Sequence, residues 1–401
     1  MTHMSDSRID RLAELAVAAG ANVQAGQVVS VSGRPGYEEL VRAIAAAAYR
    51  RGARFVDVAY FDPYVKLARL RHAAEDTLDW VPPWMGRRVL EIGEMAGANI
   101  AITSLQAPGI YDGIDPVRAG RDRLPSLREG IQVVMQAQVN WTVVPFPTPE
   151  WAAVVFPDLA PADALERLWE QIGHVCRLEE DDPAAAWRAR AAELTATAAG
   201  LTERRIDALR FVGPGTDLTV GLFPTSRWLG GEEHRADGLL HLPNIPTEEV
   251  FTTPDPERTE GYVTSTMPLE IAGTVITGLR VRFEGGRAVE ITADHGAEVL
   301  RARAAVDDGA ARLGEVALVD GSGRIGPLGT VFYETLLDEN AASHIALGAA
   351  YPAGVAEGPD RERANTSEIH IDFMIGGPEV TVYAVDGDGH ESVLLADGAW
   401  A

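Results

Sequence analysis

A histidine and an aspartate two residues apart are the most informative chemical feature of this sequence. They lie in an apolar segment whose alternation is typical of a β-strand. In a strand, His370 and Asp372 share one face, and the apolar residues between and around them share the other. An ionised aspartate in such a segment is costly unless it is paired or binds a cation. The segment alone leaves two interpretations open, a metal site and a hydrogen-bonded His–Asp pair in the core.

A second histidine lies among residues that could also bind a cation. Within the segment 337–348, Asn340 is predicted to be the N-cap of a helix that contains His344. Glu339 directly precedes the cap. Tyr351 follows His344 by two helical turns, so it would lie on the same face if the helix continued that far.

Further carboxylates stand at the ends of predicted strands. Glu315 opens the apolar strand 316–319, and the pair Glu248 and Glu249 follows a proline-containing turn and precedes another apolar stretch. Each of them alone is typical of a solvated loop residue. Together, two histidines and four or five carboxylates suit two divalent ions better than one tetrahedral zinc ion.

The elements that must position these residues differ between the two halves of the chain. In the first half, strand-like and helix-like segments alternate, which predicts an α/β N-terminal domain with a layered, mostly parallel sheet. The predicted strands lie near 28–31, 55–59, 99–103 and 139–144, and the predicted helices near 12–19, 40–49, 127–136 and 162–174.

The second half has short strands separated by Gly and Pro turns. It is predicted to be a mainly β, α+β C-terminal domain that carries the metal-binding residues, with short helices near 297–305 and 341–350. An Ala-rich helix at 184–201 connects the halves. The sequence therefore predicts two domains, residues 1–200 and 201–401.

Composition limits the possible partners and compartments. The 401 residues are 46% hydrophobic and 23% charged, which is typical of a folded globular protein, and the net charge of −24 disfavours nucleic acid and anionic membrane surfaces. The single cysteine, Cys176, cannot form an intrachain disulfide and is interpreted as a packing residue. Because neither a leader-like apolar run nor a stretch of 18 apolar residues occurs, we expect a cytoplasmic protein.

Some motifs are interpreted as structural. The segment 321–326 matches G-x-G-x-x-G, but Pro327 and β-branched residues follow where a dinucleotide site requires a helix, so a glycine-rich loop is favoured. His234, His241 and His295 are interpreted as surface or structural residues.

The chain resembles the M29 family of metallo-aminopeptidases, the thermophilic or AmpS-type aminopeptidases of bacteria and archaea. The resemblance covers nearly the whole chain and is most specific in four ordered motifs. These motifs lie at 244–254, 313–318, 338–348 and 369–376.

The resemblance implies a set of metal ligands in this sequence. Glu315 resembles the carboxylate that bridges two metals. Glu249 resembles another ligand, with Glu248 as the alternative if the alignment is shifted by one residue. The remaining implied ligands are His344, His370 and Asp372.

Two more residues resemble positions that take part in catalysis. Glu339 matches a position that either binds metal or transfers a proton, and Tyr351 matches the tyrosine that faces the reacting carbonyl. The resemblance implies a homodimeric, metal-dependent aminopeptidase that hydrolyses peptides with a free N-terminus. Two divalent ions per chain (zinc, cobalt or manganese) would activate the attacking water. The alternatives are a dipeptidase or amidase with the same metal site and a non-catalytic peptide-binding protein on this fold.

Overall fold

The computed structural model describes residues 7–105, 109–111, 113–122, 124–125, 127–271 and 273–401. The chain forms two compact units, the first comprising residues 1–191 and 232–246 and the second comprising 192–231 and 247–401. The boundary at 191–192 lies inside the long helix α9 (Pro183–Glu203). The single division predicted between residues 200 and 201 stays a prediction.

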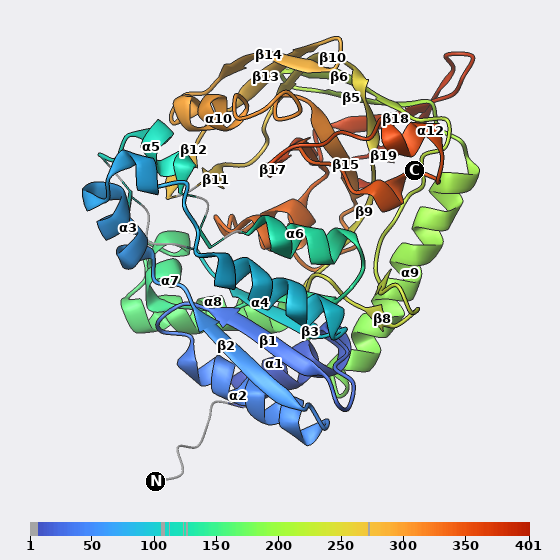
Figure 1. The fold of residues 1–401 in the computed structure, drawn as a ribbon. Coiled ribbons are helices and arrows are strands. Elements are labelled where there is room, and N and C mark those ends of the chain that lie inside the picture. Colours follow the sequence, from blue (N-terminus) through green and yellow to red (C-terminus); the bar gives the residue numbers. More distant parts are fainter. Residues whose placement is uncertain (1–6, 106–108, 112, 123, 126, 272) are drawn as a thin grey trace. The chain divides into compact units, whose positions relative to one another are not determined.

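A four-stranded parallel sheet forms the centre of the first unit (Figure 1). Its strands, in the order β2-β1-β3-β4, are β2 (Phe55–Tyr60), β1 (Val28–Gly33), β3 (Ala98–Thr103) and β4 (Asn140–Pro145). Val29, Val31 and Ile100 are buried, because the inner strands of a parallel sheet are covered by the connecting helices. This sheet agrees with the predicted α/β character of the first half.

Helices and short turns precede, connect and follow these strands. They are α1 (Ser7–Leu15), η1 (Ala16–Gly20), α2 (Glu38–Arg50), α3 (Pro63–His72), η2 (Glu75–Thr77), α4 (Pro83–Glu94), α5 (Pro116–Arg121), α6 (Arg128–Met135), α7 (Pro149–Val155) and α8 (Pro161–Val175). Several begin with proline, whose missing N–H is not needed in the first turn. Asp62 caps α3 by accepting the N–H of Tyr64 at 2.8 Å.

The segment 232–246 returns to the first unit from within the second half of the sequence. It contains the small hairpin of β7 (Glu233–His234) and β8 (Leu240–His241). Beyond the hairpin it runs beside β4, where the N–H of Val143 donates to Pro243 O at 2.7 Å and the N–H of Ile245 donates to Val143 O at 3.0 Å. These main-chain bonds explain why the segment belongs to the first unit.

The second unit contains two large antiparallel sheets (Figure 1). The eight-stranded sheet has, in spatial order, β14 (Arg287–Thr292), β13 (Arg280–Glu284), β10 (Pro254–Thr264), β6 (Thr216–Leu222), β5 (Ala208–Gly213), β18 (Thr381–Val385), β19 (Glu391–Ala396) and β20 (Ala399–Trp400). The four-stranded sheet has β17 (His370–Met374), β16 (His344–Gly348), β15 (Leu313–Val319) and β9 (Glu249–Thr252). The remaining elements are β11 (Leu269–Ile271), β12 (Thr274–Ile276), α10 (Ala297–Arg303), η3 (Gly326–Leu328), α11 (Thr335–Asp338), η4 (Glu339–Ala341), η5 (Pro352–Gly354) and α12 (Pro359–Glu362).

Side chains from both sheets form one hydrophobic core in the second unit. Phe211 and Val220 belong to the eight-stranded sheet, and Leu318, Ile345 and Phe373 belong to the four-stranded sheet. One face of the four-stranded sheet is therefore apolar and buried against this core, which leaves the other face available for polar residues.

The helix predicted over 341–350 is wrong. Residues 344–348 form strand β16, paired on both sides with β15 and β17, and Ile345 and Leu347 are fully buried in the core. Pairing with two neighbours outweighs local helix propensity at this place. Asn340 is not an N-cap either, since it lies within η4.

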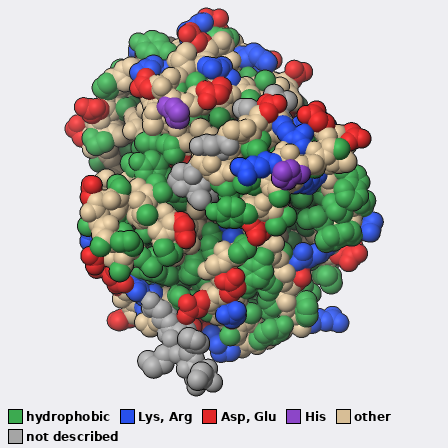
Figure 2. Space-filling model, turned by 90° about the vertical axis from the view of Figure 1, so that its left-hand side faces the viewer, with side chains coloured by type: hydrophobic (Ala, Val, Ile, Leu, Met, Phe, Trp, Pro, Cys, Tyr) green, Lys and Arg blue, Asp and Glu red, His purple; other side chains and the backbone are tan. Residues whose placement is uncertain are grey.

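The surface carries charges of both signs and several exposed aromatic rings. Figure 2 shows one face, on which basic side chains are scattered among acidic ones and hydrophobic side chains gather in groups. In the first unit Tyr64, Trp80 and Trp84 are each more than half exposed, at 64%, 61% and 57%. Among the described residues, no helix is both long and apolar enough to cross a lipid bilayer. Residues 1–6, which entered the prediction of a cytoplasmic protein, lie outside the described part of the chain.

Candidate metal centre

The polar face of the four-stranded sheet brings the predicted ligands together. Glu315 on β15 lies opposite Ala346 on β16, which in turn lies opposite Asp372 on β17. His344 lies two residues before Ala346 on the same face, because side chains alternate along a strand. Glu249, at the start of β9, pairs with Val319 and faces the same way. Alanines in the middle of this face leave room between the charged side chains.

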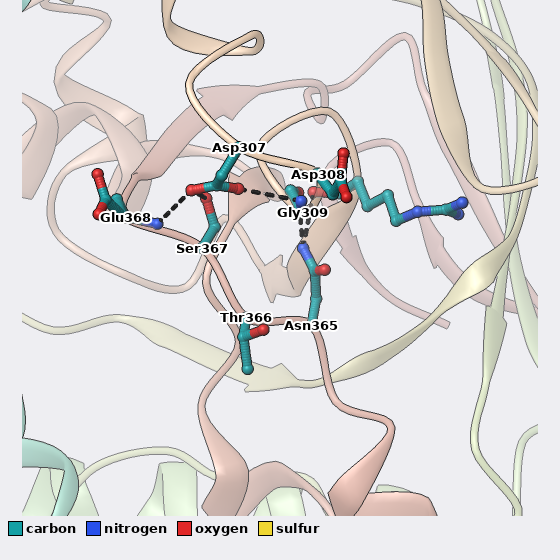
Figure 3. Close-up of a pocket in the computed structure, with 8 residues that line it drawn as sticks. Asp307, Asp308, Gly309, Asn365, Thr366, Ser367 and Glu368 are labelled. Atoms are coloured by element: carbon teal, nitrogen blue, oxygen red, sulfur yellow. Dashed lines mark hydrogen bonds between the residues drawn. The ribbon is translucent and has the colours of Figure 1, made fainter.

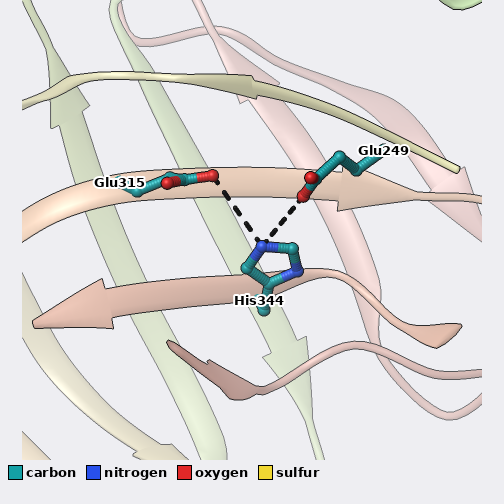
Figure 4. Close-up of side chains that lie close together, drawn as sticks. All are labelled: Glu249, Glu315 and His344. Carbon is teal, nitrogen blue, oxygen red and sulfur yellow. Dashed lines mark ion pairs between the residues drawn. The ribbon is translucent and has the colours of Figure 1, made fainter. Parts of the chain in front are cut away.

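Two groups of potential ligands result, and they share one carboxylate. Glu249, Glu315 and His344 form the first group, and Glu315, His370 and Asp372 form the second, each with ligand atoms within 4.8 Å of one another. His344 Nε2 lies 3.0 Å from Glu249 Oε2 and 3.8 Å from Glu315 Oε1 (Figure 4). His370 Nε2 lies 3.2 Å from Glu315 Oε2. The two oxygens of Glu315 thus face different histidines.

The donor set fits divalent cations. Three carboxylates, Glu249, Glu315 and Asp372, are buried within a few ångströms of one another, which would be repulsive without compensating positive charge. Glu249 Oε2 and Asp372 Oδ1 are buried and make no hydrogen bond, although histidine nitrogens are nearby. Buried carboxylate oxygens without hydrogen-bond donors are accounted for when they bind a metal.

The charges of the cluster shift its pKa values strongly. Burial disfavours the charged imidazolium of His344, but the close, negatively charged carboxylates of Glu249 and Glu315 outweigh this and raise its pKa well above the usual value. Burial also disfavours charge on His370, and the charge of Asp372 together with contacts to Glu315 raises its pKa in the same way. Burial raises the pKa of Glu249 more than His344 lowers it. Without metal, protons neutralise the cluster, so a binding cation must displace them.

Main-chain carbonyls orient both imidazole rings. His370 Nδ1 donates to Ala349 O at 2.7 Å, and His344 Nδ1 lies 3.2 Å from Ala342 O. With Nδ1 held in this way, each ring presents Nε2 to the carboxylates. A metal-binding histidine commonly has such a second hydrogen bond, which fixes its tautomer and orientation.

The structure distinguishes Glu249 from its neighbour Glu248. Glu248 is outside both ligand groups, and its carboxylate lies beneath the glycine-rich loop, where a Cβ added to Gly323 would come within 3.1 Å of it. Its main-chain N–H donates to Asn340 Oδ1 at 2.6 Å. The cluster therefore forms with Glu249, and the alignment shifted by one residue, which would make Glu248 the ligand, is not needed.

Glu339 and Tyr351 lie beside the cluster on irregular segments. Glu339 begins η4, and burial together with the charges of Asp372 and Glu249 raises its pKa well above the usual value. The ring of Tyr351 packs edge-on against the ring of His370, with 5.2 Å between centroids. The prediction that Tyr351 follows His344 on one helical face is wrong, because a strand and a loop separate them. Its contact with His370 arises from the pairing of β16 with β17.

Other histidines have the structural or surface roles expected of them, with one addition. His241 is buried in the first unit and packs near Trp141, and burial lowers its pKa to about 4. His234 and His295 are exposed. The addition is an exposed group at the β18–β19 hairpin, formed by Asp386, Asp388 and His390, which the sequence analysis did not single out.

Buried Cys176 fits its predicted packing role. Burial raises the pKa of its thiol, so it is not a reactive thiolate at neutral pH.

Sequence reasoning missed Asn340 and Asn365 as supports of this centre. Asn340 joins Glu248 to Leu336, since its Nδ2 donates to Leu336 O at 2.9 Å. Asn365 Nδ2 donates to the carbonyl of Gly348, and the carbonyl of the next residue, Ala349, holds His370 Nδ1. Both side chains are buried. A single asparagine in a loop or short turn is not part of a periodic sequence pattern. Only the structure therefore identifies Asn340 and Asn365.

The chain is similar to known proteins over nearly its whole length. A model of the family described as "Thermophilic metalloprotease (M29)" matches residues 5–400. Aminopeptidase T of Thermus aquaticus is 41% identical over 400 residues, covering 98% of both chains, and Aminopeptidase 2 of Geobacillus stearothermophilus is 36% identical over 406 residues, covering 99% of this chain and 98% of its own. The solved structure of wild-type AmpT from Thermus thermophilus superposes with a TM-score of 0.89 at 40% identity, covering 98% of this chain and 99% of the other.

Proposed function

The chain belongs to the M29 family of thermophilic metalloproteases, and from this premise we propose that it is an aminopeptidase that removes N-terminal residues from peptides. The observation that carries the proposal is the position of Glu315, which belongs to both ligand groups and whose two oxygens face their two different histidines. A carboxylate in this position is suited to bridge two cations. The names of the similar proteins support the choice of an exopeptidase.

We propose that the centre holds two divalent ions, with zinc, cobalt and manganese each able to occupy it. Glu249, Glu315 and His344 would hold one ion, and Glu315, His370 and Asp372 would hold the other. Each group combines one imidazole nitrogen with carboxylate oxygens, a donor set that discriminates weakly among these metals.

The metals and the chain contribute different parts of the chemistry. When bound, the ions supply a water of lowered pKa and polarise the scissile carbonyl. The chain holds the donors rigidly, because His344 and His370 are fixed through their Nδ1 atoms and Glu315 is buried on the central strand β15.

We propose that Glu339 transfers the proton, although a ligand role at the same position is the alternative. Its pKa is raised by burial and by the charges of Asp372 and Glu249, which supports proton transfer. A carboxyl group that takes up a proton readily can accept one from water and deliver it to the leaving amine. A glutamate with an ordinary pKa would be a weaker base and would accept the proton from water less readily.

We propose that the hydroxyl of Tyr351 stabilises the developing oxyanion. Its ring is held between Phe251, with centroids 5.4 Å apart, and His370. The main-chain carbonyl of Tyr351 accepts a hydrogen bond from Thr253 Oγ1 at 2.7 Å, which fixes the backbone at this residue. An oriented hydroxyl beside a metal-binding histidine can act as a preorganised donor to the reacting carbonyl oxygen.

The test is hydrolysis of matched peptides by metal-loaded protein. We expect Leu-Gly-Gly to lose its N-terminal leucine, and N-acetyl-Leu-Gly-Gly to remain intact, because an exopeptidase requires the free amine. Cleavage of both peptides at comparable rates would contradict the aminopeptidase proposal. Cleavage of dipeptides alone would indicate a dipeptidase, and binding without hydrolysis would indicate a peptide-binding protein.

We also propose a homodimer and a cytoplasmic location, which follow from the family resemblance and the composition. The exposed rings of Tyr64, Trp80 and Trp84 support self-association, since exposed apolar groups of this size often mark interfaces. Light scattering after size-exclusion chromatography measures the mass directly, and a monomer at micromolar concentration would contradict the dimer.

A further inference from the structure

A depression on the second unit adjoins the start of β17, and its polar atoms are already engaged by the chain itself (Figure 3). Asp307 Oδ1 accepts the N–H groups of Gly309 at 3.0 Å and Ala310 at 2.8 Å. Its Oδ2 accepts Ser367 Oγ at 3.0 Å and the N–H of Glu368 at 2.7 Å. With four donors around one carboxylate, this depression is better explained as a structural junction than as a ligand site.

Asn365 forms the other half of the junction. Its side chain is buried, and its Nδ2 donates to Gly348 O at 2.6 Å and to Gly309 O at 2.9 Å, with Arg312 O at 3.4 Å. Its main-chain carbonyl accepts the N–H of Ala350 at 2.9 Å. One residue therefore ties the 309–312 segment to the end of β16.

The end of β16 leads directly to a proposed metal ligand. The N–H of Ala349 donates to Ile369 O at 2.6 Å, and Ala349 O accepts His370 Nδ1 at 2.7 Å. Ala349 is the residue after Gly348, whose carbonyl Asn365 holds. Any shift of the Gly348 carbonyl would turn the next peptide group and move the acceptor that orients His370.

Steric room at Gly348 is also limited. Its φ of 109° is in the region that favours glycine, and a Cβ there would lie 2.1 Å from Ile369 O. Strands β16 and β17 lie so close together here that the backbone at Gly348 is confined to one path. The amide of Asn365 donates a hydrogen bond to the Gly348 carbonyl and so satisfies this acceptor.

We infer that Asp307 and Asn365 form a clamp that sets the imidazole of His370 for metal binding, and that Asn365 is a positioning residue of the centre. The inference rests on the proposed metal site and adds to it two residues that do not touch the ligand groups. Asp307 holds the 307–310 turn to residues 367–368, and Asn365 holds that turn to the carbonyl next to Ala349. The clamp thus acts on the second ligand group and not on the first.

The experiment compares Asn365→Asp with wild type in two properties. These are the affinity for metal and the hydrogen exchange of the ring N–H of His370. Aspartate has nearly the same shape as asparagine, but its carboxylate repels the carbonyls that the amide now binds. We expect one of the two ions to bind about 10- to 100-fold more weakly, as is typical when a hydrogen-bonded support of a ligand is removed. Equilibrium dialysis with Zn²⁺ measures both affinities.

A spectroscopic measurement separates positioning from general destabilisation. In protein labelled with 15N-histidine, and with the signals assigned through His370→Gln, the Nδ1–H of His370 should exchange slowly in wild type and faster in Asn365→Asp. The control is Thr216→Val, which removes a buried acceptor for the N–H of Thr264 at 3.1 Å within the eight-stranded sheet. It should lower the melting temperature and leave both metal affinities and the His370 signal unchanged.

The outcomes distinguish the clamp from the metal site itself. If wild-type protein binds no divalent metal, the proposed function fails. If wild type binds two ions and Asn365→Asp binds both with unchanged affinity and an unchanged His370 signal, the clamp is refuted and the metal site stands. Should Asn365→Asp not fold, Asp307→Asn replaces one acceptor oxygen of the same clamp with an amide group, and the same selective loss of one ion is expected.

Discussion

Replacing the shared carboxylate by an amide, Glu315→Gln, should remove both metal ions and all activity. The substitution keeps the size of the side chain, so the buried strand β15 should still form. Glu315 Oε1 lies 3.8 Å from His344 Nε2 and Oε2 lies 3.2 Å from His370 Nε2, so each oxygen serves one ligand group. Loss of the negative charge therefore affects both groups at once.

The size of the effect follows from these distances. At an effective dielectric constant of about 20, a unit charge at such separations contributes about 4–5 kcal/mol. Because a cation held by the same oxygens carries two charges, we treat this value as a lower bound. Since about 1.4 kcal/mol corresponds to a factor of ten, each ion should bind at least about 10³-fold more weakly.

The assay is metal content after dialysis against a fixed free-metal concentration, with melting temperature as a check on folding. Glu249→Gln should lose mainly one ion, because Glu249 belongs to a single ligand group. Glu248→Gln is the matched control, since Glu248 is a buried glutamate one residue away and lies outside both groups. A Glu315→Gln protein that retained two ions at wild-type affinity would refute the bridging assignment.

Three further predictions concern the ligands and the residues around them. Tyr351→Phe keeps the ring packed against His370 and removes the hydroxyl, so kcat should fall by about 10²–10³ at unchanged metal content, and unchanged turnover would show that Tyr351 only packs. In metal-free protein the raised pKa values of His344 and His370 contribute stability that is fully present below pH 6.5 and is lost as the pH rises through their folded values, so the melting temperature should fall as the pH is raised above 6.5. The increase in melting temperature on adding Zn²⁺ should grow over the same range, because the metal displaces those protons; a metal-free melting temperature that rises with pH would contradict this reasoning. Gly348→Ala should cost about 1–3 kcal/mol in urea unfolding, because its φ of 109° and the nearby Ile369 carbonyl leave no space for a Cβ, and wild-type stability would show that β16 and β17 can separate locally.

Alternation of side chains made part of the centre predictable. Alternation within a single strand predicts that His370 and Asp372 share one face of the sheet. Both residues lie in strand β17, as expected. The sequence around His344 predicts a helix locally, because Asn340 suits an N-cap and alanines favour a helix, whereas Ile345 and Leu347 are equally consistent with a strand. Only the pairing of β16 with two neighbours decides between these possibilities.

Long-range pairing also explains what sequence reasoning could not supply. The distance between Glu249 and His344 depends on the register of three strands, and no local pattern encodes that register. The supports Asn340 and Asn365 act through hydrogen bonds to main chain, which other polar loop residues could also make. The parallel sheet of the first unit was easier to predict, because strands and helices alternate along the chain there.

The order in which the ligands occur along the chain has a consequence for biosynthesis. Glu249 is made first, and His370 and Asp372 come only with β17, more than 100 residues later. Because both ligands lie on β17, which pairs with β16, the second ligand group cannot assemble until β17 has been synthesised. A nascent chain that ends before residue 370 therefore lacks the paired metal site, so the proposed peptidase cannot act on peptides before β17 has been made.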